Sequence, residues 1–300
     1  MKLHKVSSSA LLRGALSGAL RLAVKPLFAP HISPSLRRKG LELASLSTLN
    51  ARGIKPTQVK LGGVPALRYG QANNSTVVLY LHGGAYTAGS PGTHASLTSH
   101  LAQTSGATVF VPDYRLAPEH PYPAALEDAC FCYQALLEQG FKAAHITVAG
   151  DSAGGGLALS LLLHLKAEKM PLPKGMILLS PWADLTHPNA KASAQPQDAM
   201  LTWAGLNAAA KGYAANEALT HSGISPALGD LSGLPPTLII VGTEEILLAD
   251  VKSLAAKLKQ QGVSTECEIY EKMWHVFPLH ARMLKEADLA IHAMANFILN

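Results

Sequence analysis

The stretch ITVAGDSAGGG, residues 146–156, indicates the fold more strongly than any other part of the chain. Its first four residues form a short, β-branched apolar run that favours a buried strand, and residues 157–169 favour a helix. Between them stands Gly-x-Ser-x-Gly, a pattern typical of a nucleophile elbow in that context. The flanking glycines leave room for strained backbone angles. The motif in this context predicts Ser152 as a nucleophile. A phosphate-binding loop is the alternative, but the lysine that such a loop needs is missing.

Strand-like and helix-like segments alternate on both sides of this stretch. Strands separated by helices predict parallel pairing with right-handed crossovers, hence an α/β fold with a mostly parallel central sheet flanked by helices. Ligands bind such a sheet beyond the carboxyl ends of its strands. The predicted strands are 77–81, 108–112, 146–149, 176–179, 238–241 and 267–270, and the predicted helices are 123–138, 157–169, 200–213, 250–261 and 283–299.

Two segments stand outside the alternation. Residues 183–234 are long and rich in Ala, Asn and Pro, and residues 1–30 are apolar but interrupted by Arg13, Arg21 and Lys25. These charges leave neither the apolar core of a signal peptide nor the roughly 18 apolar residues of a membrane span, and they favour an amphipathic helix. We expect residues 1–50 and the insertion 183–234 to form a cap over a core of residues 51–182 and 235–300.

Composition narrows the class of protein. A hydrophobic fraction of 48% and a charged fraction of 15% allow one large core. The net charge of +5 comes from dispersed basic residues, which gives little support for nucleic-acid binding. Cys130, Cys132 and Cys267 fit no zinc pattern and no useful disulfide, so we expect a cytoplasmic protein with no metal, no organic cofactor and no stable membrane insertion.

A second motif, His82-Gly83-Gly84-Ala85-Tyr86, follows the predicted strand 77–81. Backbone N–H groups at the end of a strand can point at a carbonyl oxygen that gains negative charge during acyl transfer. A pair of glycines after a strand is by itself more often a plain turn. Its position ahead of a nucleophile elbow favours an oxyanion loop.

With residues 113–121 (DYRLAPEHP), these motifs resemble those of the hormone-sensitive-lipase-like, or bacterial type IV, esterases, and the resemblance covers essentially residues 60–300. It implies an α/β-hydrolase fold with a helical cap and hydrolysis of carboxylic esters with short to medium acyl chains; some relatives act on lactones or acetyl esters. It also implies Gly83, Gly84 and Ala153 as oxyanion donors. The family usually has a third glycine where this chain has Ala85.

The remaining catalytic groups are predicted from their places after strands. A serine needs a base, which this fold presents after the last strand, where His275 lies in a segment similar to the family's histidine loop; His280 is the alternative. The acid should follow the preceding strand. Glu245 occupies the place where the family usually has aspartate, and Asp250 stays open as an alternative.

The predicted substrate is a small-molecule ester. We expect Tyr86 and Trp203 to form walls of a pocket beneath the cap. The last strand should lie at an edge of the sheet, where it would allow a homodimer. A binding protein that has kept this fold and an amidase that uses the same triad are the alternative functions.

Overall fold

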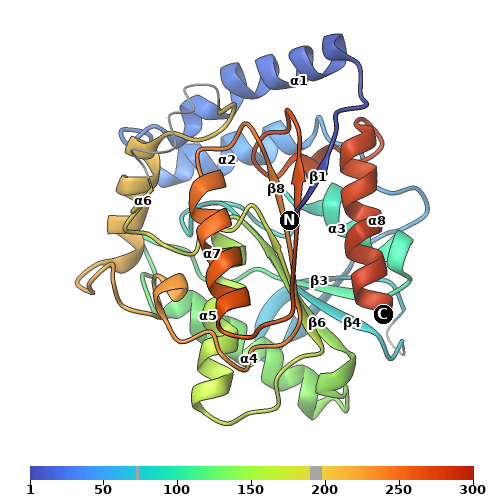
Figure 1. Cartoon of the computed structure of the whole chain (residues 1–300), viewed down its shortest axis with the longest axis vertical. Helices are drawn as coiled ribbons and strands as arrows, with labels where there is room; N and C mark the ends of the chain where they lie inside the picture. Colours follow the sequence, from blue (N-terminus) through green and yellow to red (C-terminus); the bar gives the residue numbers. More distant parts are fainter. Residues whose placement is uncertain (72–73, 190–197) are drawn as a thin grey trace.

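The computed structural model describes residues 1–71, 74–189 and 198–300, and a nine-stranded sheet forms the centre of this part of the chain (Figure 1). The strands are β1 (Lys2–His4), β2 (Thr57–Leu61), β3 (Val64–Tyr69), β4 (Val77–Leu81), β5 (Thr108–Pro112), β6 (Ile146–Asp151), β7 (Gly175–Leu179), β8 (Thr237–Gly242) and β9 (Thr265–Tyr270). Their order is β1-β9-β8-β7-β6-β4-β5-β3-β2. Every neighbouring pair is parallel except β2–β3 and β3–β5, which confirms the predicted mostly parallel sheet.

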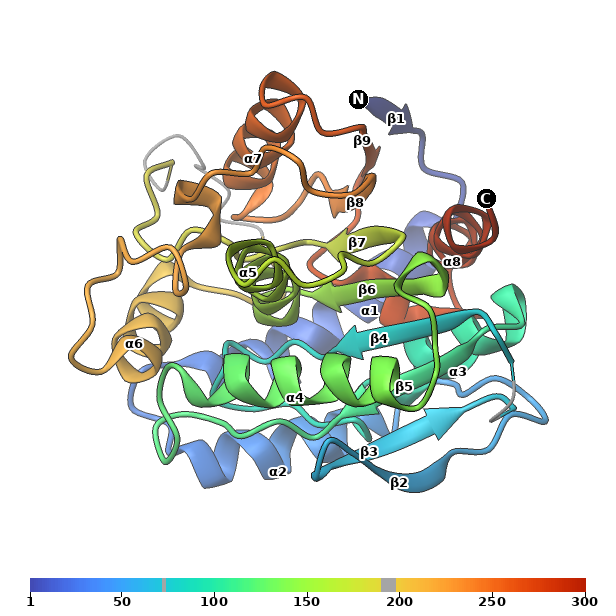
Figure 2. The ribbon, with the colours of Figure 1, turned by 90° about the horizontal axis from the view of Figure 1, so that it is seen from below.

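Helices cover both faces of the sheet (Figure 2). They are α1 (Ala10–Ala23), α2 (Pro34–Ser45), α3 (Ala95–Ser105), α4 (Ala124–Glu138), α5 (Ala153–Ala167), α6 (Trp203–Ala214), α7 (Leu248–Gln260) and α8 (Lys285–Leu299). Side chains of β4 alternate between the two faces, as the period of a strand requires: Val77 and Leu79 join the core beneath α4, α5 and α7, whereas Val78 and Tyr80 join the core beneath α3 and α8.

The position predicted for the last strand is wrong. β9 is not at the edge of the sheet, because β1 pairs with it in parallel and places Lys2 opposite Glu268. The chain therefore covers this edge with its own N-terminus, and the structural basis for a homodimer through β9 is lost. Lys2–His4 also belongs to the sheet, although it falls within the segment predicted as cap.

The rest of the N-terminal segment lies over the carboxyl ends of the parallel strands. α1 and α2 run across one end of the molecule, with α6 of the insertion nearby (Figure 1). Lys25 Nζ joins the two segments by donating a hydrogen bond of 2.7 Å to the backbone oxygen of Asp198. Residues 190–197 of the predicted insertion lie outside the described residues. Across the described ranges, no helix has the length and apolarity needed to cross a membrane.

Candidate active site

Ser152 stands on a sharp turn between β6 and α5. Its backbone angles are φ 52° and ψ −121°, a conformation that residues with side chains rarely adopt. Two hydrogen bonds of 2.8 Å hold it there, one from Ser152 N to Leu179 O and one from Trp182 N to Ser152 O. The turn needs glycine beside it, since a Cβ on Gly154 would lie only 2.0 Å from Leu81 O. This is the strained geometry expected of a nucleophile elbow.

His275 and Glu245 meet beyond the carboxyl ends of β9 and β8. His275 Nδ1 lies 2.9 Å from Glu245 Oε2, and both side chains are buried. The other carboxylate oxygen, Oε1, accepts hydrogen bonds from Gly242 N at 2.6 Å and from the Ser180 hydroxyl at 2.8 Å. Ser180 Oγ in turn accepts one from Val276 N at 3.2 Å. These contacts orient the carboxylate so that Oε2 faces the imidazole.

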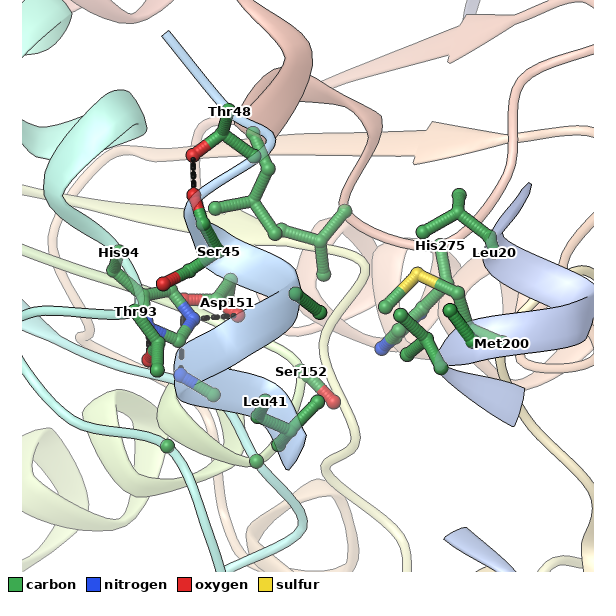
Figure 3. Close-up of a pocket in the computed structure, with 18 of the residues that line it drawn as sticks. Leu20, Leu41, Ser45, Thr48, Thr93, His94, Asp151, Ser152, Met200 and His275 are labelled. Carbon is green, nitrogen blue, oxygen red and sulfur yellow. Dashed lines mark hydrogen bonds and ion pairs between the residues drawn. The ribbon is translucent and has the colours of Figure 1, made fainter. Parts of the chain in front are cut away.

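The Glu245 contact determines how His275 carries its proton. A carboxylate can only accept, so Nδ1 donates and the lone pair of neutral His275 lies on Nε2. Nε2 is buried without a hydrogen-bond partner among the described residues, and His275 lines the same pocket as Ser152 (Figure 3). Burial opposes the charged form, but the hydrogen bond and charge of Glu245, with the charges of Asp198 and Asp151, outweigh it and raise the pKa of His275.

The alternative residues are placed differently. Asp250 accepts a hydrogen bond of 2.7 Å from Asn189 Nδ2 rather than facing His275. His280 also lines the pocket, but burial lowers its pKa to about 4, and its ring packs edge-on against Trp274. The structure thus brings together Glu245 and His275, the pair that the sequence favoured.

The oxyanion loop differs from the prediction at one residue. Gly83 N donates a hydrogen bond of 3.0 Å to Asp151 Oδ1, so this N–H is already engaged. By contrast, the N–H groups of Gly84, Ala85 and Ala153 have no acceptor in the described part of the chain. Gly84 and Ala85 line the pocket, and Ala85 has a φ of 55°. The geometry favours Gly84, Ala85 and Ala153 as donors and gives Gly83 a structural role.

A buried ion pair lies directly behind this loop, and sequence reasoning missed it. Asp151 Oδ2 lies 3.2 Å from His94 Nε2, while Asp151 Oδ1 also accepts a hydrogen bond of 2.8 Å from Tyr80. The opposite nitrogen of His94, Nδ1, lies 2.9 Å from Thr93 Oγ1 and 3.2 Å from Ser90 O, so both ring nitrogens have polar neighbours. Burial disfavours both charges, but their attraction prevails: the pKa of His94 is raised and that of Asp151 is lowered.

The pocket in front of Ser152 is apolar and has a volume of about 310 Å³. Its walls include Leu20 of α1, Leu41 of α2, and Met200 of the insertion (Figure 3). The N-terminal helices and the insertion therefore contribute walls to the same pocket.

The two aromatic walls predicted from the sequence lie outside this pocket. Tyr86 is turned into the core and stacks on Tyr213 with ring centroids 3.7 Å apart. Trp203 packs edge-on against His187 at 4.9 Å. Neither side chain is among the residues that line this pocket, whose walls are mostly aliphatic with Phe28, so a role of Tyr86 and Trp203 in substrate binding stays a prediction.

A metal centre finds no support in the donor set. Within the described ranges, no cluster of three or more His, Cys, Asp or Glu side chains is arranged to hold a metal ion. All three cysteines are free thiols.

Comparisons with known proteins place the chain among esterases of this fold. Residues 78–279 match a family model described as the alpha/beta hydrolase fold. An acetyl-hydrolase from Streptomyces hygroscopicus is 41% identical over 222 residues, 74% of each chain, and an esterase from Acinetobacter venetianus is 39% identical over 247 residues, 81% of each. A solved hormone-sensitive lipase from a metagenome library is 36% identical, with a TM-score of 0.90 over 98% of each chain.

Fold, site and relatives together define a carboxylesterase of the α/β-hydrolase superfamily. Within it, the chain belongs to the hormone-sensitive-lipase-like family of esterases, as its sequence motifs predicted.

Proposed function

We propose that the protein hydrolyses short to medium chain carboxylic esters through an acyl-enzyme, with Ser152 as nucleophile, His275 as base and Glu245 as the orienting acid. One observation carries the proposal. His275 Nε2 is buried in the pocket that Ser152 lines and has no hydrogen-bond partner in the described part of the chain, while Nδ1 is held by Glu245. A neutral imidazole held in this way is suited to accept the serine proton.

The reaction then proceeds in two stages. His275 Nε2 takes the hydroxyl proton as Ser152 Oγ bonds to the ester carbonyl carbon, and the carbonyl oxygen becomes an oxyanion. Gly84, Ala85 and Ala153 are placed to donate to it, and one such donor typically contributes about 3 to 4 kcal/mol to transition-state stabilisation. The alcohol leaves with the proton from His275. Water, activated by the same histidine, then releases the acid and restores the serine.

The pocket supports an apolar acyl or alcohol group of modest size. Its walls are mostly aliphatic, and most of them come from residues 1–50 and the insertion 183–234, which we propose form a cap over the core of residues 51–182 and 235–300. Acetyl esters belong to the proposed range because one similar protein is named an acetyl-hydrolase. Lactones, which present the same carbonyl chemistry, are also included.

The test is hydrolysis of p-nitrophenyl acetate, butyrate, octanoate and palmitate by the wild type and by Ser152→Ala. We expect the highest kcat/KM below a chain length of about ten carbons, and a loss of at least ~10³-fold in the variant. Ser160→Ala is a matched control, because Ser160 lies in the same helix and its hydroxyl bonds Gly223 O. Activity that survives in Ser152→Ala would refute the proposed nucleophile. Faster cleavage of the matching p-nitroanilides would favour an amidase.

A further inference from the structure

The positive charge of the protein is concentrated in its first 50 residues. These contain eight Lys and Arg residues and a single acidic residue, Glu42, which gives +7. The whole chain has a net charge of +5, so residues 51–300 carry −2. Arg37 is buried and Arg38 pairs with Glu119, yet Lys5 and Lys39 remain exposed. Such an asymmetry indicates an anionic partner for this segment.

α1 has apolar side chains on two sides, and only the inner side faces the rest of the described chain. Its inner side contributes Leu16 and Leu20 to the pocket, but no residue of the helix is fully buried. On the outer side, Leu11 and Leu22 are 86% and 83% exposed. They share one side of the helix, since they are three turns apart. A Cβ built on Gly14, on the same side, would meet no atom of the described residues within 4 Å, so the described part of the chain leaves this position uncovered.

α2 repeats the arrangement on the neighbouring wall of the pocket. Leu36, Lys39 and Leu43 recur at the spacing of one helix face, and all three are exposed. Leu43 is 70% exposed and also lines the pocket, so the outer apolar surface continues into the substrate site. Leu46, just after the helix, is 79% exposed.

We propose that one docking face binds an anionic lipid surface. It consists of the outward leucines of α1 and α2 with the exposed cations beside them: Leu11, Leu22, Leu36, Leu43, Lys5 and Lys39. Leucines beside basic residues are the composition of helices that lie in a membrane interface. A second copy of the chain fits less well, because it would bring one strongly positive segment against another. Lipid binding itself does not depend on the proposed chemistry. The idea that the lipid interface delivers an ester substrate to Ser152 does rest on the proposed function.

The experiment measures co-sedimentation of Ser152→Ala protein with vesicles, so that hydrolysis does not alter the lipid. The vesicles are phosphatidylcholine alone or phosphatidylcholine with about one third phosphatidylglycerol. We expect binding to the anionic vesicles at about 0.1 M NaCl and weaker binding at about 1 M, where the screening length falls from ~10 to ~3 Å. Adding Leu11→Ser and Leu22→Ser should weaken binding at least about tenfold.

Leu289→Ser with Leu299→Ser is the matched control. It makes the same change at exposed leucines of α8, 48% and 58% accessible, and should leave vesicle binding intact. In an enzyme that retains Ser152, Leu11→Ser and Leu22→Ser should leave hydrolysis of dissolved p-nitrophenyl butyrate unchanged, because neither leucine lines the pocket.

The docking proposal would be overturned if the protein did not bind anionic vesicles, or if the variant with Leu11→Ser and Leu22→Ser bound them equally well. If the protein did not bind vesicles but formed a dimer that these substitutions abolished, the face would be a dimer interface instead. An inactive wild type that still binds vesicles would refute the proposed catalysis alone.

Discussion

Replacing Glu245 by glutamine tests the catalytic acid with almost no change in shape. Glu245 Oε1 accepts from Gly242 N and Ser180 Oγ, and Oε2 accepts from His275 Nδ1. An amide has one oxygen and one NH₂ group. The oxygen must stay at the Oε1 position, since an NH₂ there would face the N–H of Gly242. The NH₂ group of Glu245→Gln is therefore directed at His275 Nδ1.

This orientation removes the base. An NH₂ donor favours the His275 tautomer with the proton on Nε2, where no lone pair remains for Ser152. The corresponding Asp→Asn change in a serine protease lowers kcat about 10⁴-fold, or roughly 5.5 kcal/mol at 1.36 kcal/mol per decade. We expect a loss of this order in kcat on p-nitrophenyl butyrate. KM should change little, because Glu245 does not line the pocket.

The pH profile gives a second readout of the same variant. The base works only when neutral, so wild-type kcat/KM rises as the pH passes the pKa of His275. Glu245 is the main cause that raises this pKa against the effect of burial. In Glu245→Gln the acid limb of the profile should therefore move to lower pH, measured on the residual activity.

Asp250→Asn is the control for this substitution. Asp250 contacts Asn189 rather than His275, and its loss should leave kcat within about twofold of the wild type. If Glu245→Gln keeps more than about a tenth of the activity, or if Asp250→Asn is the variant that collapses, the assignment of the acid is wrong.

Two further predictions concern the elbow and the ion pair behind it. Gly154→Ala should abolish soluble folded protein or lower its melting temperature by many degrees, since the new Cβ would overlap the backbone oxygen of Leu81. Gly14→Ala, where the Cβ enters open space, should instead stabilise the protein by about 0.5 to 1 kcal/mol. Thermal unfolding measures both effects. His94→Ala leaves Asp151 buried without its cation and should cost about 3 kcal/mol of unfolding free energy and lower kcat more than it changes KM. Folding raises the pKa of His94, so the positive charge of His94 stabilises the folded protein fully below the unfolded pKa of about 6.5. This part of the stability is lost as the pH rises through the folded pKa. If the loss of unfolding free energy in His94→Ala grows at alkaline pH, the charge assignment is wrong.

The parts of the site that could be predicted are those set by local chain geometry. β4 and β5 begin and end at the predicted residues, and the other predicted strands agree within two residues. Ser152, Glu245 and His275 come within five residues of the ends of β6, β8 and β9, so the parallel sheet brings them to one edge. Glycines beside Ser152 signal the turn because only they fit its close backbone contacts.

The parts that could not be predicted depend on contacts across the chain. Gly83 looked like an oxyanion donor until Asp151, 68 residues away, engaged its N–H. His94 carries no motif, and its charge follows from the carboxylate that the fold places beside it. The sequence did not predict α3, because several of its buried positions are polar. Thr98, for example, is buried and donates its hydroxyl to the backbone oxygen of His94.

The N-terminal segment shows how one stretch of chain can serve the sheet and the site together. β1 pairs with β9, and Val6 N donates to Glu271, which follows that strand and precedes His275 by four residues. Glu286 at the start of α8 accepts the backbone N–H of Ser8, which fixes the chain just before α1. α1 then reaches the pocket with no fully buried residue of its own, so its position depends on these attachments and on the 3₁₀ turn Lys25–Phe28 that follows it. The same contacts therefore hold β9, which leads to the proposed base His275, and α1, which forms a wall of the pocket, so we expect changes in this segment to affect both the position of His275 and the shape of the pocket.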